Sequence, residues 1–169
     1  GITTREIYNR AFALLKKKKN GFASKYKLKK AIYELGPTGF PFEKFVGAIL
    51  LYSGYKVKTG QFFEGKCITH EVDVVAQKNA QFIIAECKFH GEEGRNCNVK
   101  EPLYIHSRYQ DILNFYDGKS NVKIPNEGWL VTNTRFTEDA RKYGQCCGLY
   151  FLSWDFQFGR ALCGARCEI

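Results

Sequence analysis

The sequence lacks an apolar run long enough to cross a membrane. Its longest run, residues 45–52, is far shorter than the roughly 20 residues of a membrane-spanning helix. Its first residues do not have the pattern of a signal peptide, and we expect none; its seven cysteines have neither the spacing of a disulfide scaffold nor a C-x-x-C pair. We therefore expect a cytoplasmic protein with reduced thiols, and keep zinc only as a minor alternative at Cys146, Cys147, Cys163 and Cys167.

The composition excludes disorder, collagen and coiled coil. Of the 169 residues, 44% are hydrophobic and 25% are charged, as in an ordinary globular protein. The length favours one compact domain with a small appendage. Because the chain starts at Gly1 without an initiator methionine, we expect it to be part of a longer chain.

Positive charge is concentrated in the first 40 residues. They hold ten of the 26 Lys and Arg residues but only two of the 17 Asp and Glu residues. Such a segment suits a polyanionic partner, because lysine and arginine neutralise phosphates and release counterions. A solvated helix face, or a junction to absent residues, is the equally weighted alternative.

Turn-forming residues divide the chain at Gly36-Pro37-Thr38-Gly39. Before this boundary, residues 1–36 have the apolar spacing of two helices. After it, residues 40–169 predict a helix, three strands, a helix, a strand, a helix and a strand. This order is typical of an α/β (α+β) sandwich, with a mixed central sheet flanked by helices.

Charged residues interrupt two neighbouring strands of this pattern. Asp73 lies on the strand predicted at 66–76, and Glu86 and Lys88 lie on the strand at 82–89. Side chains alternate along a strand, so Glu86 and Lys88 share one side. A short connection makes the two strands antiparallel neighbours, so the three side chains can converge. Burying them is costly unless they compensate one another.

Two adjacent carboxylates and a lysine are suited to hydrolysis of a phosphodiester. A divalent cation such as Mg²⁺ or Mn²⁺ relieves the repulsion between the carboxylates. The lysine can hold an attacking water and neutralise charge on a phosphate. The simpler alternative is a salt bridge on a solvated strand face.

Asp73 followed by Glu86-Cys87-Lys88, with Glu43 on the preceding helix, resembles the PD-(D/E)xK nuclease superfamily. The likeness is strongest to its Mrr-like restriction endonuclease branch, related to archaeal Holliday-junction resolvases. Val72 stands where the motif usually has proline. The resemblance spans about residues 40–160 and includes Phe42-Glu43-Lys44-Phe45, Gly54-Tyr55-Lys56-Val57, residues 130–140 and Trp154-Asp155. It implies a restriction-endonuclease-like core.

The resemblance also implies roles for individual residues. Asp73 and Glu86 would bind the metal with the main-chain carbonyl of Cys87, and Glu43 would add a carboxylate through water. Lys88 would orient the nucleophile or stabilise the transition state. Substrate contacts are expected from His70, His90, Lys100, Arg108 and Gln110, although each also suits a solvated strand or helix face.

Residues 1–36 resemble the C-terminal helices of an ATP-cone, a nucleotide-binding regulatory module, and the matching stretch is residues 23–32. An ATP-cone joined to an Mrr-like nuclease resembles a known prokaryotic architecture. The early strands and triphosphate-binding residues of the cone are not in this chain. We therefore expect ATP binding only in a longer chain that contains the whole cone.

The leading prediction is a Mg²⁺- or Mn²⁺-dependent DNA endonuclease of restriction or repair and junction-processing type. Two alternatives stay open: a non-catalytic DNA-binding module with the nuclease fold, and a regulatory protein linked to the ATP-cone. A homodimer would pair two active sites for double-strand cleavage. The sequence leaves the oligomeric state and the DNA target open.

Overall fold

The computed structural model describes residues 20–92, 94–120, 122–153 and 157–158. The helix predicted in the first 19 residues, Trp154-Asp155 and two of the seven cysteines lie outside this part of the chain. Within it, every helix is too short or too polar to span a bilayer.

The described helices follow the predicted order. They are α2 (Asn20–Tyr33), α3 (Phe40–Tyr52), α4 (Lys100–Tyr116) and α5 (Glu138–Cys146). Pro41 lies in the first turn of α3, where its missing N–H costs no helical hydrogen bond. Residues 34–39 separate α2 from α3 at the predicted boundary. The division into two domains stays a prediction.

Six strands form one mixed sheet in the order β1-β2-β3-β5-β7-β8. They are β1 (Lys56–Glu64), β2 (Thr69–Lys78), β3 (Gln81–Lys88), β5 (Glu127–Thr132), β7 (Tyr150–Leu152) and β8 (Gln157–Phe158). The first three strands are antiparallel, whereas β3, β5 and β7 run parallel. A separate short pair joins β4 (Asn96–Cys97) to β6 (Arg135–Phe136). The predicted α/β architecture is confirmed.

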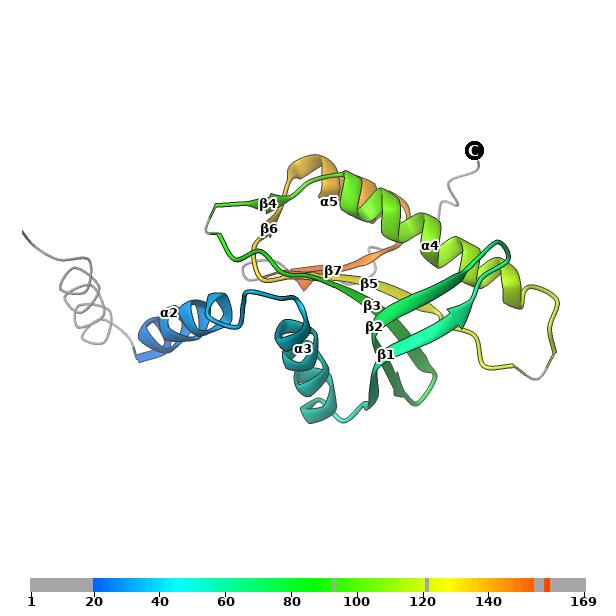
Figure 1. The fold of residues 1–169 in the computed structure, drawn as a ribbon, viewed down its shortest axis with the longest axis horizontal. Coiled ribbons are helices and arrows are strands. Elements are labelled where there is room, and N and C mark those ends of the chain that lie inside the picture. Colours follow the sequence, from blue (N-terminus) through cyan, green and yellow to red (C-terminus); the bar gives the residue numbers. More distant parts are fainter. Residues whose placement is uncertain (1–19, 93, 121, 154–156, 159–169) are drawn as a thin grey trace, which may run out of the picture.

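Helices cover both faces of the sheet (Figure 1). On one face, Phe42, Val46 and Leu50 of α3 pack in a cluster with Val74 and inner residues of β3 and β5. On the other face, α4 and α5 cover the sheet through apolar clusters that include Ile105, Ile112 and Ala140. The charged residues of interest therefore lie on strands that are buried between two helical layers.

The main departure from the predicted elements is the first strand. The sequence predicts a strand at 55–58, but β1 continues to Glu64 with regularly alternating exposure. Gly60 interrupts the apolar pattern and hides this continuation. The paired strands β4 and β6 were not predicted, because two residues are too few to show periodicity.

Candidate active site

Asp73 lies where the regular structure of β2 is interrupted. The β2–β3 ladder ends at the pair Val74 and Ala85, and the β1–β2 pairing skips Gly60 and Asp73. Gly60 has a φ of 58°, a left-handed conformation that glycine adopts without steric cost. Val72 packs on the α4 side and Val74 on the α3 side, although strict alternation would place both on one face. The strand therefore changes its facing at Asp73.

A side-chain hydrogen bond replaces the ladder at this point. The main-chain N–H of Cys87 donates to Oδ2 of Asp73 at 2.7 Å. This bond fixes the carboxylate beside the main chain of β3, between Glu86 and Lys88 in sequence. The sequence correctly predicts that Asp73, Glu86 and Lys88 lie close together.

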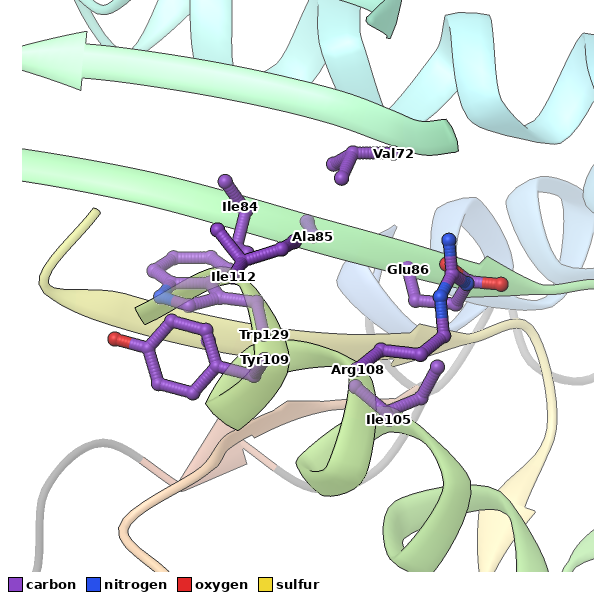
Figure 2. A pocket seen from close by; sticks show the side chains of 10 residues that line it. Val72, Ile84, Ala85, Glu86, Ile105, Arg108, Tyr109, Ile112 and Trp129 are labelled. Carbon is purple, nitrogen blue, oxygen red and sulfur yellow. The ribbon is translucent and has the colours of Figure 1, made fainter. Parts of the chain in front are cut away.

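Both oxygens of Glu86 contact cations. The Nζ of Lys88 lies 3.1 Å from Oε1, and Nη1 of Arg108 lies 2.7 Å from Oε2. Arg108 also donates to the main-chain carbonyl of Glu71. Figure 2 shows Arg108 reaching from α4 to the carboxylate of Glu86, beside a small apolar pocket between β3 and α4. Arg108, predicted as a substrate contact, thus contacts another candidate site residue.

Negative charge outweighs positive charge around Asp73. Burial and the neighbouring Glu86 carboxylate raise the pKa of Asp73 to about 7, with a further contribution from Glu43. The Cys87 N–H and Lys88 act in the opposite direction. The pKa of Glu43 is also raised, by burial and then by Glu86 and Glu71. Glu43 therefore lies within electrostatic reach of Glu86 and Asp73, and its role at a metal site stays a prediction.

Lys88 remains a cation in this setting. Its burial alone would lower the pKa, but the charge of Glu86, its hydrogen bond to Glu86 and the carboxylate of Glu101 raise it. Glu101 Oε2 lies 3.8 Å from Lys88 Nζ. The ring centre of Tyr104 lies 5.8 Å from Lys88 Nζ and 5.4 Å from Arg108 Cζ. Sequence reasoning missed Glu101 and Tyr104, because no local pattern shows which turn of α4 meets Lys88.

The donor chemistry of the cluster fits a hard divalent cation. The raised pKa values of Asp73 and Glu43 show that burial and neighbouring carboxylates disfavour their charged forms, which a bound cation would stabilise. In the described part of the chain, no three His, Cys, Asp or Glu side chains form a group that could hold a metal ion. Asp73 and Glu86 would therefore need the Cys87 carbonyl and water to complete the shell. Mg²⁺ usually retains several waters in proteins.

His70 is not brought into this cluster. Its ring is buried, and Nε2 lies 2.8 Å from Oδ2 of Asp111 on α4. The carboxylate of Asp111 also accepts hydrogen bonds from the main-chain N–H groups of Cys67 and Ile68. Asp111 therefore connects His70 and the β1–β2 turn to α4, and His70 is only 7% exposed, which leaves little surface for the substrate contact that was predicted.

The other predicted contacts occupy different positions. The N–H and carbonyl of His90 both bond the side chain of Asn133, and its ring Nε2 lies 3.2 Å from Sγ of Cys97. Lys100 is exposed at the start of α4. Gln110 is also exposed, and its Nε2 lies 3.3 Å from His106 Nε2. Substrate contact by these residues stays a prediction.

The comparisons with known proteins support the fold and leave the activity open. No family model matches the sequence. An uncharacterised protein of Archaeoglobus fulgidus is 33% identical over 103 residues, covering 61% of this chain and 54% of that protein. The chain thus spans about half the length of that relative.

Two solved structures are similar. The crystal structure of a protein of unknown function superposes with a TM-score of 0.62 at 29% identity, covering 70% of this chain and 60% of the other. This likeness shows a shared fold. A repair endonuclease from Pyrococcus abyssi has a TM-score of 0.41 at 16% identity, with 69% of this chain and 44% of the other covered. That second likeness is too weak to assign an activity.

Proposed function

We propose that this chain is a metal-dependent DNA endonuclease that hydrolyses phosphodiester bonds. The observation that carries the proposal is the grouping of Asp73, Glu86, Glu43 and Lys88 at the interrupted end of the β2–β3 ladder. Perturbed pKa values grouped among facing carboxylates are typical of catalytic sites. The resemblance of Asp73 and Glu86-Cys87-Lys88 to the PD-(D/E)xK motif assigns this group its chemistry.

Asp73, Glu86 and the Cys87 carbonyl would hold Mg²⁺ or Mn²⁺, with Glu43 acting through water. When bound, the cation would supply an activated water and neutralise charge on the phosphate. The Cys87 N–H keeps Asp73 in place for this role. Glu86 would exchange at least one of its contacts with Lys88 and Arg108 for the metal.

Lys88 would stabilise charge that develops on the reacting phosphate. Its raised pKa keeps it protonated at neutral pH, which makes it unsuited to act as a base. An ammonium group held beside Glu86 is suited to the role of an electrophilic stabiliser.

The direct test is cleavage of supercoiled plasmid in Mg²⁺ and in Mn²⁺. We expect the wild type to nick or linearise the plasmid, and Asp73→Asn, Glu86→Gln and Lys88→Met to lose at least about a hundredfold in rate. Lys142→Gln is the matched control, because Lys142 pairs with exposed Glu138 on α5. Equal rates for the wild type and all three site variants would contradict the proposal.

A parallel assay separates the restriction and junction-processing forms of the proposal. A four-way junction and a linear duplex of the same sequence are offered at equal concentration. Preferential cleavage of the junction would indicate the junction-processing form. Measuring the molecular mass of the active species would show whether a dimer pairs two sites.

The second candidate is a non-catalytic DNA-binding module with the same fold. The observation that favours it is that both oxygens of Glu86 already contact Lys88 and Arg108. Such a module would bind duplex DNA equally well in Mg²⁺ and in chelator, and would cleave under neither condition.

A further inference from the structure

A polar cavity lies apart from the apolar pocket beside Glu86. It has a volume of about 170 Å³ and is bordered by α2, the loop before β4 and the loop between β5 and β6. Its lining includes the cationic side chains of Lys29, Arg95 and Arg135 and the amides of Asn96 and Asn133. None of the described residues that line it is acidic.

The short β4–β6 pair builds one wall of this cavity. Asn96 and Arg135 are direct partners in that pair, so Arg95 and Arg135 belong to adjacent segments. The opposite wall comes from α2, where Lys29 Nζ lies 6.0 Å from the ring centre of Tyr33. Three cations separated by up to about a hundred residues are thus gathered around one small volume.

This lining is suited to a phosphate group. Guanidinium groups present a planar fork of donors that matches two phosphate oxygens, and the lysine adds a point charge. Amide donors can satisfy the remaining oxygens.

The cavity is connected to the candidate catalytic strand. Asn133 lines the cavity and hydrogen-bonds the main-chain N–H and carbonyl of His90, both at 2.8 Å. His90 follows Lys88 by two residues, and Lys88 pairs with Thr132 in the parallel ladder. The positive charge of Arg95, second to burial, lowers the pKa of His90, which places Arg95 within electrostatic reach of this segment.

We propose that Lys29, Arg95 and Arg135 form a phosphate-binding site that receives a backbone phosphate of the nucleic-acid strand beside the cleaved bond. The assignment to a nucleic acid rests on the proposed function, whereas the binding of a phosphate group does not. The site would hold the strand in register with Lys88 without reading its sequence. It also gives α2 a direct part in substrate binding.

The test measures binding in chelator, where no metal-dependent cleavage takes place. A fluorescent DNA duplex is titrated with the wild type, with the double variant Arg95→Gln/Arg135→Gln, and with Lys29→Gln. The matched control is Lys119→Gln/Lys123→Gln, which removes two positive charges from the segment between α4 and β5. This segment precedes β5, whereas Asn133 follows it. Melting temperatures check that every variant is folded, and Lys29→Gln serves if the double variant is not.

We expect the Arg95/Arg135 double variant to bind duplex about tenfold more weakly. When the logarithm of its binding constant for duplex is plotted against the logarithm of the salt concentration, the slope should be smaller in magnitude by about one. The control should change affinity less than twofold. Arg95→Lys/Arg135→Lys should fall between the wild type and the glutamine variant, because charge is retained and the fork is lost.

A second titration with inorganic phosphate identifies the source of the ligand. If the double variant loses phosphate binding but keeps its duplex affinity, the nucleic-acid assignment is overturned. If the double variant and the control bind both ligands equally, the site itself is overturned. A wild type that binds duplex through these residues but never cleaves it would contradict the proposed function and support this site.

Discussion

The main-chain N–H of Cys87 donates to the carboxylate of Asp73 at 2.7 Å, one residue beyond the last pair of the β2–β3 ladder. A side chain thus continues the hydrogen bonding of the sheet where the main chain of β2 turns away. The bond favours the charged form of Asp73, while burial and Glu86 favour the neutral form more strongly. The balance leaves this carboxyl group able to change its charge near neutral pH.

Asp73 should make the metal-free protein less stable as pH rises. Its ordinary pKa is 3.8 and its folded pKa is about 7, so between these values the folded state retains a proton that the unfolded state has released. The free energy of unfolding should fall by about 2 kcal/mol between about pH 4 and pH 7, once solvent screening is allowed for. Above about pH 7 it should level off. Chemical denaturation at several pH values in chelator measures this. Asp73→Asn should lose this part of the dependence.

Divalent metal should stabilise the wild type at pH 8, where Asp73 is ionised. Binding to the folded state alone raises stability by about 2.7 kcal/mol at a hundred times the dissociation constant. Thermal melts with and without Mn²⁺ measure the shift. Asp73→Asn and Glu86→Gln should show little of it, and an equal shift in these variants would place the metal elsewhere.

Arg108 should hold Glu86 in its present orientation. Arg108→Ala leaves a largely buried carboxylate with Lys88 as its remaining ion-pair partner among the described residues, which should cost about 2 kcal/mol of stability. Arg108→Lys should cost less but should not restore the contact to the Glu71 carbonyl. The control is Lys142→Ala, which should leave the denaturation midpoint unchanged because its pair with Glu138 is exposed.

Gly60 should be required for the position of Asp73. An alanine at this left-handed position is strained by about 1–2 kcal/mol, and relief of that strain would change the pairing opposite Asp73. Gly118→Ala is the matched control, since Gly118 also has a positive φ and its added Cβ would meet no atom within 4 Å. We expect similar losses of stability, but a loss of plasmid cleavage only for Gly60→Ala. Equal cleavage by both would contradict this role.

His70 should support the fold and not the reaction. His70→Asn removes the bond to Asp111, so the melting temperature should fall by several degrees. The rate of plasmid cleavage, measured below that melting temperature, should stay within about threefold of the wild type. A specific loss of cleavage with an unchanged melting temperature would restore the predicted substrate contact.

The sequence was sufficient to predict that Asp73, Glu86 and Lys88 lie close together, because short-range patterns encode their positions. Alternation places Glu86 and Lys88 on one face, and the turn at Asn79 returns the chain so that β2 and β3 pair. The predicted boundary near Gly36 and Pro37 also agrees with the gap between α2 and α3. These features depend on residues that are close in sequence.

The features that could not be predicted depend on contacts between distant segments. The pairing of Arg108 with Glu86 requires the position of α4 over β3, which no local periodicity specifies. Strict alternation puts Val72 and Val74 on one side of a strand, and the irregularity opposite Gly60 places them on opposite sides. The β4–β6 pair, and with it the cavity beside Arg135, joins two-residue strands that are about 40 residues apart.

A crystal soaked in Mn²⁺ and examined by anomalous scattering would show whether Asp73 and Glu86 bind a metal ion. We predict one strong peak within ligand distance of Asp73 and Glu86, and its loss in Asp73→Asn. A wild-type crystal with no peak at these carboxylates, or with one that persists in Asp73→Asn, would contradict this prediction.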